Sequence, residues 1–374
     1  MLNDALQKLE ETARSPKRAM EAYRQAGRPV AGCIPEYTPE VMVHAAGFIP
    51  FGLWGGETTI MLADSYIPTF ACSLVRSCAE YGLNGTYRGL SFIIAPILCD
   101  ALKGCVQTFR VAVKDPPVLP FSLPQNRTLP SAAAFTAQEY RALGEKIQKL
   151  TGAGISGQAM RRSIRIYNEH SRAMRDFDRA AAEHTDVIGA RARQAVFKSA
   201  WFMEKEEHTG LVRQITRELE ERPACRKNPA RVVLTGVSAG SAALMDLLEE
   251  EGFDVVGDHV YQDSWTYLHP IREDLEDPVM ALAEHWIQVG GSCVAHERRR
   301  SRSAAVLKLA KEREAGAVVL CLMKFCDPEE YEAPLMLAEL KKSCPTLTLD
   351  IDQNSDNLEQ LRTKIQTFRD VLDS

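Results

Sequence analysis

The sequence lacks several features that would assign a common function at once. It contains no G-x-G-x-x-G fingerprint and no Walker lysine, so neither of two standard nucleotide-binding loops is present. Its cysteines form no C-x₂-C series of the ferredoxin type, and nothing has the paired spacing typical of zinc sites. The net charge of -5 offers no basic stripe, which argues against nucleic acid as a partner.

Long apolar stretches are also missing. No run of about 18 apolar residues occurs, so no segment is expected to span a membrane. The first residues, MLNDAL, contain neither a basic n-region nor an apolar h-region, so we expect no signal peptide. A cytoplasmic protein is therefore expected, in which cysteine thiols stay reduced.

What the chain does have is ten cysteines in 374 residues. Cys326 is the most informative, because it follows an apolar run, 317–322, that is typical of a buried parallel strand. Cys72 and Cys99 occupy comparable places, near a helix start and a strand end. Open α/β sheets place their ligands at the carboxyl edge. Three cysteines converging on one cleft would therefore make an iron–sulfur site.

The other cysteines are weighed against the default of inert packing, since free cysteine is among the most buried residue types. Cys33 is the main competitor, because it precedes a helix in the first loop. Cys321 lies inside an apolar strand and is expected in the core. The remaining ones are expected on other sides of helices, in a linker or at the periphery: Cys78, Cys105, Cys225, Cys293 and Cys344.

Apolar runs alternate with helical patterns in both halves of the chain, which predicts parallel sheets. We expect an α/β protein of two lobes, 1–222 and 223–374, with a helical segment at about 131–222 and a linker at 223–229. The expected strands are 29–34, 49–56, 90–98, 118–123, 231–236, 253–258, 317–322 and 346–352, and the expected helices outside the helical segment include 39–46, 66–81 and 357–372.

Other motifs leave alternatives open. The stretch 236–240 (GVSAG) resembles a phosphate-binding turn and also G-x-S-x-G, which would make Ser238 a nucleophile; an ordinary strand–helix turn is the favoured interpretation. The basic run 298–302 is either a solvated loop before a helix or a contact for a CoA phosphate or a partner. His44 is expected to be structural, and Glu57 either faces the cleft or is solvated.

Further short motifs recur along the chain in a fixed order. They are PE at 39–40, HAAG at 44–47, WGG at 54–56, FACS at 70–73, CD at 99–100, YNEH at 167–170, KEEHT at 205–209, MKFCDPEEY at 323–331, DIDQ at 350–353 and RTKIQTF at 362–368.

Through these motifs the chain resembles, over nearly its whole length, the smaller (beta) subunits of the 2-hydroxyacyl-CoA dehydratases, relatives of benzoyl-CoA reductase. It is most similar to subunits acting on 2-hydroxyisocaproyl-, phenyllactyl- or lactoyl-CoA. The resemblance implies two flavodoxin-like lobes with a [4Fe–4S] cluster in the cleft between them, held by Cys72, Cys99 and Cys326. Thiolates are the ligands that such clusters require.

The resemblance also implies a function in anaerobic amino-acid fermentation. The enzyme would be an oxygen-sensitive hydro-lyase that converts an (R)-2-hydroxyacyl-CoA to the 2-enoyl-CoA through a ketyl radical. The implied partners are a larger alpha subunit, in a heterodimer, and an ATP-dependent iron–sulfur activator that injects one electron. The cluster of this chain would relay or store that electron, and no catalytic acid or base is assigned. Two alternatives stay open: a non-catalytic scaffold subunit, and a homodimeric double-cubane relative that acts as a low-potential reductase.

Overall fold

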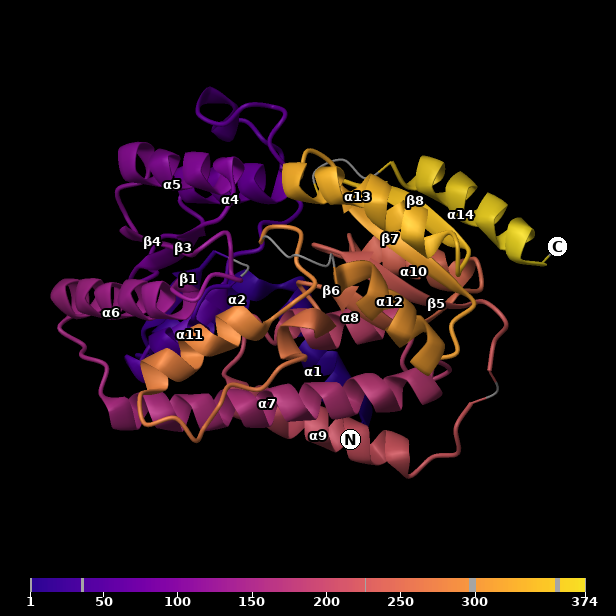
Figure 1. Cartoon of the computed structure of the whole chain (residues 1–374), viewed down its shortest axis with the longest axis horizontal. Helices are drawn as coiled ribbons and strands as arrows, with labels where there is room; N and C mark the ends of the chain where they lie inside the picture. The colour runs from indigo at the N-terminus through magenta and orange to yellow at the C-terminus, as the bar shows by residue number, and fades with distance from the viewer. Residues whose placement is uncertain (1, 35–36, 226, 296–300, 354–356, 374) are drawn as a thin grey trace.

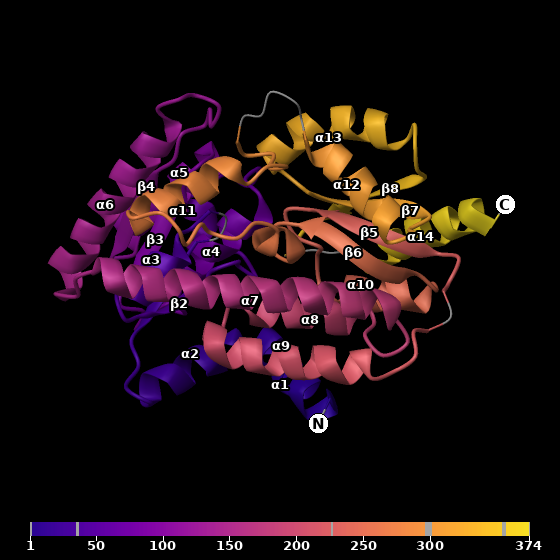
Figure 2. The same ribbon diagram turned by 60° about the horizontal axis from the view of Figure 1, so that its bottom comes forward.

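The computed structural model describes residues 2–34, 37–225, 227–295, 301–353 and 357–373. Two lobes, each built around a parallel sheet, lie next to one another over a layer of long helices (Figures 1 and 2). Each sheet has four strands, so the prediction of an α/β protein with parallel sheets is confirmed. None of the described helices is both long enough and apolar enough to cross a membrane.

The N-terminal sheet has the order β2-β1-β3-β4, the order in which a doubly wound sheet begins. Its central strand β1 is buried along its whole length, as expected for a strand covered by helices on both faces. Val30 of β1 pairs with Ile49 of β2, and Gly32 of β1 pairs with Ile93 of β3. The elements are β1 (Val30–Cys33), α3 (Glu40–Ala45), β2 (Ile49–Gly52), η1 (Ala63–Ser65), α4 (Ser73–Leu83), β3 (Ile93–Ile97), α5 (Asp100–Ala112) and β4 (Val118–Ser122).

Between β4 and the second sheet, the described residues form helices and no strand, as the sequence predicts. Ser156 begins α7 by accepting the N–H of Ala159 at 3.1 Å, and Gly152 ends α6 with φ +76°, a conformation glycine adopts without strain. Helix α7 runs beneath both lobes (Figure 2). These helices are α6 (Ala132–Thr151), α7 (Gly157–Glu183), α8 (Ala190–Ser199) and α9 (Lys205–Glu220), joined by the N-terminal α1 (Leu2–Arg14) and α2 (Pro16–Gln25).

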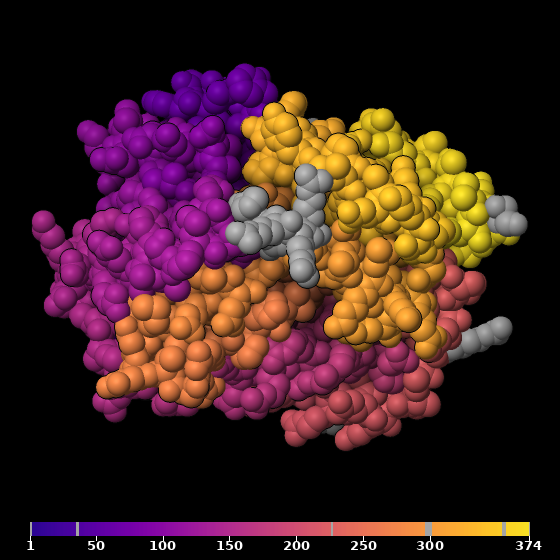
Figure 3. Space-filling model, in the orientation of Figure 1, coloured from indigo at the N-terminus to yellow at the C-terminus, as the bar shows by residue number. Residues whose placement is uncertain are grey.

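The C-terminal sheet repeats the plan with the order β6-β5-β7-β8. Between β6 and β7 the chain returns to the N-terminal lobe, where α11 packs against α6. Figure 3 shows this orange segment lying against the purple surface. The elements are β5 (Arg231–Gly236), α10 (Ala242–Glu250), β6 (Asp254–Val260), η2 (Ser264–Tyr267), α11 (Pro278–Gln288), α12 (Ser301–Glu312), β7 (Ala317–Met323), α13 (Asp327–Leu340), β8 (Thr346–Ile351) and α14 (Leu358–Asp373).

The predicted helix over 66–81 is wrong at its start. Helix α4 begins only at Ser73, and the residues before it form a loop after the short η1. One oxygen of Glu80, Oε2, accepts the backbone N–H groups of Met61, Leu62 and Ala63 at 2.8 to 3.0 Å. These bonds hold residues 61–63, at the start of η1, against α4 and satisfy backbone donors that would otherwise need another acceptor.

Candidate functional site

The three cysteines predicted as ligands share one structural position. Cys72 is the N-cap of α4, Cys99 is the N-cap of α5 and Cys326 is the N-cap of α13. Each therefore lies where a helix leaves backbone N–H groups without intrahelical partners and carries a partial positive charge. In Figure 1, α13 begins on the side of its lobe that faces the other lobe. Such a position favours a thiolate or another anion.

Cys72 and Cys99 lie on neighbouring helices of the N-terminal lobe, since α4 packs against α5. The thiol of Cys99 accepts the N–H of Leu102 at 3.4 Å, which is the capping bond of α5. Cys105, one and a half turns further along α5, is fully buried. Burial raises its pKa well above the usual value, and the charges of Cys78, Cys72 and Cys99 raise it further. Thiols therefore gather at this edge of the first sheet.

Cys326 has a different neighbour, Cys293. A hydrogen bond to Cys326 is the largest cause that raises the pKa of Cys293 well above its usual value, followed by burial. The backbone N–H of Cys293 donates to the hydroxyl of Tyr261 at 2.6 Å, and that hydroxyl donates to Gly291 O at 3.0 Å. Cys293 was expected at the periphery, and that expectation is wrong, because this loop folds back over β6.

The two lobes are hydrogen-bonded to each other beside Cys72. The backbone N–H of Gln353, just after β8, donates to Ser73 Oγ at 3.1 Å. Its side-chain amide donates to Trp54 O at 3.2 Å, in the loop after β2. The carboxyl ends of strands from both sheets therefore meet at the first turn of α4.

The three predicted ligands have the chemistry that an iron–sulfur cluster requires. Among the described residues, no three His, Cys, Asp or Glu side chains converge closely enough to hold one metal ion. Ligands of a cluster bind different iron atoms and stand further apart than ligands of one ion. The three thiols come with helix N-termini, whose N–H groups can donate to cluster sulfurs and offset negative charge. The residues present therefore suit the group that the resemblance implies.

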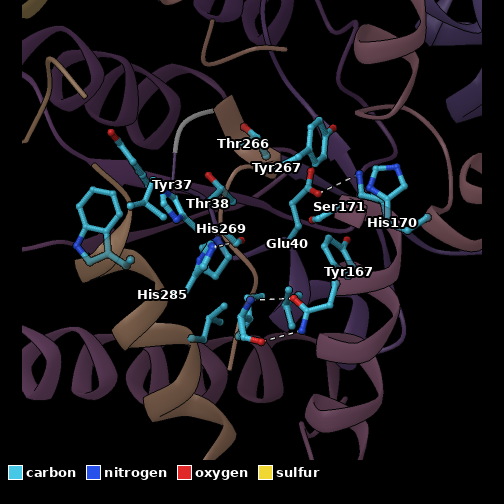
Figure 4. Close-up of a pocket in the computed structure, with 18 of the residues that line it drawn as sticks. Tyr37, Thr38, Glu40, Tyr167, His170, Ser171, Thr266, Tyr267, His269 and His285 are labelled. Carbon is cyan, nitrogen blue, oxygen red and sulfur yellow. Dashed lines mark hydrogen bonds and ion pairs between the residues drawn. The ribbon is translucent and has the colours of Figure 1, made fainter. Parts of the chain in front are cut away.

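A separate cavity of about 130 Å³ lies where the N-terminal lobe, the helical layer and the 265–289 segment meet (Figure 4). Glu40 and Tyr167 lie on one side of it, and His269 and His285 lie on the other. Burial lowers the pKa of His285 to about 4, so its neutral ring donates from Nε2 to His269 O at 3.0 Å. A cavity of about 150 Å³ can hold a benzene ring, so this space admits a small, mostly apolar group.

A buried ion pair forms part of the cavity wall. Lys205 Nζ lies 3.1 Å from Glu40 Oε2 and within 6 Å of the ring centres of Tyr167 and Trp201. Glu40 Oε1 and the Tyr167 hydroxyl have no hydrogen-bond partner within the described part of the chain. The cavity lining therefore includes an acceptor in Glu40 and a donor in Tyr167 that a guest could use, and the indole N–H of Trp286 is also without a hydrogen-bond partner among the described residues. The sequence motifs contain Glu40 and Lys205 but assign no role to either, because nothing in the sequence places them together.

Two titratable groups lie near the carboxyl edge of the second sheet. Asp263, directly after β6, is buried, and burial followed by the charge of Asp258 raises its pKa to about 8. Burial lowers the pKa of Lys198, against the opposing effects of Asp263 and Glu57. Burial therefore disfavours the charged form of both side chains, and the charge of each opposes that effect in the other. Sequence reasoning missed both residues.

The structure settles several weaker hypotheses. Ser238 is buried, and its hydroxyl donates to Gln262 Oε1 at 2.8 Å. The hydroxyl also accepts the N–H of Gly240, and within the described residues it has no hydrogen bond to a histidine that could act as a base. His44 contacts Ser163 Oγ at 2.8 Å, in keeping with a structural role.

Glu57 is exposed. Residues 298–300 of the basic run lie outside the described residues. Arg302 is buried against Glu329, so the solvated-loop interpretation is wrong for it.

The core cysteines behave as expected, with one difference. Cys321 is fully buried in β7, and Cys78 is buried beneath the loop after β2, with its Sγ 3.1 Å from Leu53 O. Cys33 ends β1 instead of lying in a loop. Burial, followed by the charge of Glu40, raises its pKa well above the usual value. An inert packing role therefore suits Cys33 better than that of a competing ligand.

Known proteins are similar to this chain over nearly its whole length. The sequence model of the family described as 2-hydroxyglutaryl-CoA dehydratase, D-component, matches residues 35–372. The lactoyl-CoA dehydratase subunit beta of Anaerotignum propionicum is 36% identical over 98% of both chains. The (R)-phenyllactyl-CoA dehydratase beta subunit of Clostridium sporogenes is 34% identical over 96% of both. The (R)-2-hydroxyglutaryl-CoA dehydratase subunit beta of Acidaminococcus fermentans is 30% identical over 98% of both.

Proposed function

Because the chain belongs to the 2-hydroxyglutaryl-CoA dehydratase D-component family, we propose that it is the beta subunit of an oxygen-sensitive (R)-2-hydroxyacyl-CoA dehydratase. The relatives are named as dehydratase subunits, and dehydratases are hydro-lyases, so the chain is a subunit of an enzyme of that class. The observation that carries the proposal is the full-length match to three beta subunits, combined with three cysteines that each begin a helix.

Cys72, Cys99 and Cys326 would hold one [4Fe–4S] cluster between the lobes. When bound, the cluster supplies one-electron redox chemistry at low potential. The chain's own contribution is structural and electrostatic. Three helix N-termini stabilise negative charge, and the Gln353 contacts hold the second lobe against the start of α4. The proposed role of this subunit is to relay or store an electron.

The overall reaction removes water from a 2-hydroxyacyl thioester whose β-hydrogen is not acidic. A one-electron reduction of the thioester carbonyl allows the α-hydroxyl to leave as hydroxide and makes the β-proton acidic, after which the electron is returned. The larger alpha subunit and an ATP-dependent activator are the proposed partners. The sequence contains neither a Walker lysine nor a G-x-G-x-x-G fingerprint, which supports the need for a separate ATP-dependent activator.

The test is a reconstitution without oxygen. The chain, its larger partner subunit and the activator, with ATP, Mg²⁺ and a strong reductant, should convert an (R)-2-hydroxyacyl-CoA to the 2-enoyl-CoA. A panel of lactoyl-, phenyllactyl- and 2-hydroxyglutaryl-CoA would identify the substrate. The chain alone should neither hydrolyse ATP nor dehydrate any of them. Turnover by the chain alone, or turnover indifferent to air and reductant, would contradict the proposal.

Iron analysis separates the alternatives. If the chain were only a scaffold subunit, it would bind no iron, and its Cys326→Ser variant would support activity as well as the unsubstituted chain does. A double-cubane relative would hold about twice the iron of a single [4Fe–4S] cluster and extra sulfide. We also propose that the lobes divide near 223–229, so that limited proteolysis should cut there before it cuts within β7.

A further inference from the structure

The turn that presents Cys326 has an unusual backbone. Phe325, the residue before it, has φ +61°, in the left-handed region that a bulky side chain rarely adopts. The other two described non-glycine residues with positive φ are Tyr37 and Glu314. Such a conformation persists only where the surroundings over-determine it. The neighbours of this turn should therefore include groups that hold it in place.

Two consecutive glutamates of α13 hold the turn from its helix side. Glu330 Oε1 accepts the N–H of Phe325 at 2.8 Å. Glu329 Oε2 accepts the N–H of Met323 at 3.2 Å, at the end of β7. Glu329 Oε1 also accepts the N–H of Val237 at 3.1 Å, at the end of β5. One buried carboxylate therefore ties the ends of two neighbouring strands to the first turn of the helix that begins at Cys326.

The buried carboxylate has a buried cation beneath it. Arg302 Nη2 lies 2.9 Å from Glu329 Oε1, and both side chains are 1% exposed. Arg302 Nη1 lies 2.9 Å from Glu332 Oε2, one turn further along α13. Buried ion pairs contribute little net stability compared with apolar packing, and in several proteins their value is to specify one conformation. Here the pair specifies the geometry of the turn.

We propose that Glu329 is a positioning residue for Cys326, held by Arg302 and assisted by Glu330. This inference rests on the proposed function, since it takes Cys326 as a cluster ligand. The backbone N–H of Glu329 also donates to Cys326 O at 2.9 Å, within the first turn of α13. Glu329 acts by keeping the 323–326 turn in the one conformation that places the Cys326 thiol at the helix start.

The chain supplies a matched control. Glu329→Gln and Glu332→Gln each remove one negative charge from the same arginine, but only Glu329 accepts backbone N–H groups of the strand ends. A second pair, Glu330→Ala and Glu330→Gln, tests the turn at an exposed side chain whose loss should not unfold the protein. Glutamine at 330 keeps an oxygen that can accept the N–H of Phe325, whereas alanine does not.

The experiment uses the full chain, reconstituted with iron and sulfide without oxygen. Iron content and the electron paramagnetic resonance signal of the reduced cluster are compared with those of the unsubstituted chain. We expect Glu329→Gln to lose iron several-fold or to shift the resonance signal, and Glu332→Gln to stay close to the unsubstituted chain. Glu330→Ala should shift the signal, and Glu330→Gln should restore it.

Equal iron and equal signals in Glu329→Gln and Glu332→Gln would overturn the inference, and so would a Glu330→Ala chain indistinguishable from the original. If Glu329→Gln fails to fold, the Glu330 pair decides the matter. An unsubstituted chain that binds no iron would overturn the proposed function itself, and the positioning role with it. Iron in that chain with no difference among the variants would overturn the positioning role alone.

Discussion

The two lobes share one strand order but hold their cysteines in different ways. In the N-terminal lobe, the loop before Cys72 is held by Glu80, which accepts three backbone N–H groups through one oxygen. In the C-terminal lobe, the turn before Cys326 is held by Glu329, whose charge is balanced by the buried Arg302. Both lobes thus use a glutamate on the helix that the cysteine caps.

This difference shows that the order of strands and the local conformation of each cysteine have separate causes. Each sheet has the same order of parallel strands, and the end of β8 is hydrogen-bonded to the loop after β2 and the start of α4. The conformation of each cysteine then depends on local hydrogen bonds. We infer that the C-terminal lobe, which relies on buried charges, responds more strongly to the loss of one side chain than the N-terminal lobe does.

The largest effect is expected for Arg302→Met. It leaves Glu329 as a buried carboxylate without its cation, which should lower the free energy of unfolding by about 3–5 kcal/mol. The matched control is Arg362→Met, which removes an arginine from its exposed pairs with Glu250 and Glu251 and should cost less than about 1 kcal/mol. Denaturant unfolding of both variants measures the difference. Similar losses in the two variants would show that the buried Arg302 pair contributes no more than an exposed one.

A pH dependence should follow from Asp263 in the C-terminal lobe. Its pKa is raised to about 8 in the folded protein, whereas the ordinary value is 3.8. Folding therefore binds a proton between these values, and this contribution to stability is lost as the pH rises from about 4 to about 8. Asp263→Asn should reduce the fall in stability between pH 5 and pH 8 by on the order of 2–4 kcal/mol.

Asp350→Asn is the control for that titration, because Asp350 forms a surface pair with Lys364. Its profile of stability against pH should follow that of the unsubstituted chain. If Asp263→Asn and Asp350→Asn gave the same profile, the raised pKa of Asp263 would be refuted.

A smaller effect is expected for Glu80→Ala in the N-terminal lobe. The substitution leaves three N–H groups of the 61–63 loop without their acceptor, but Met61 and Leu62 are exposed and water can replace it in part. We expect a loss of about 1–3 kcal/mol and faster amide exchange in that loop. A loss of stability as large as that of Arg302→Met would contradict the prediction that the C-terminal lobe responds more strongly to the loss of one side chain.

The smallest effect is expected at the contact between the lobes. Gln353→Ala removes the side-chain hydrogen bond to Trp54 O and the longer one, at 3.4 Å, that Gln353 Oε1 accepts from Ser77 Oγ, but it keeps the backbone bond to Ser73. The expected cost is about 1 kcal/mol, since one neutral hydrogen bond contributes about that much and the longer bond adds little. Gln366→Ala, which removes a surface bond to Glu251, is the control. Unchanged protease sensitivity in Gln353→Ala would show that this contact does not hold the lobes together.

Much of the fold could be predicted because a fully buried strand has a continuous run of apolar residues in its sequence. The runs at 231–236 and 317–322 became β5 and β7 almost residue for residue. The start of α4 could not be predicted in this way, because the chain ahead of it is held by a tertiary contact, the bonds from Glu80 to residues 17–19 positions earlier. Helix α1 was missed although Leu2, Ala5 and Leu9, its buried residues, recur at helical spacing.

The candidate site was predicted only in part for a related reason. A strand end followed by Cys326-Asp327-Pro328 predicts a turn at the carboxyl edge of the sheet, and α13, which was not predicted, begins there with proline in its first turn. The neighbours of that turn come from distant positions in the chain. Cys293 reaches Cys326 through a loop anchored on Tyr261, and Arg302 reaches Glu329 from α12. Neither contact has a spacing that the sequence could reveal.

The measurement that tests the account most directly is the iron content of single cysteine variants, reconstituted without oxygen and checked by electron paramagnetic resonance. The chain should hold about four iron atoms, and Cys72→Ser, Cys99→Ser and Cys326→Ser should each lose most of them. Cys344→Ser, at the loop before β8, should retain them all. Full iron in Cys326→Ser, or loss of iron in Cys344→Ser equal to that in Cys326→Ser, would contradict a cluster held by cysteines from both lobes.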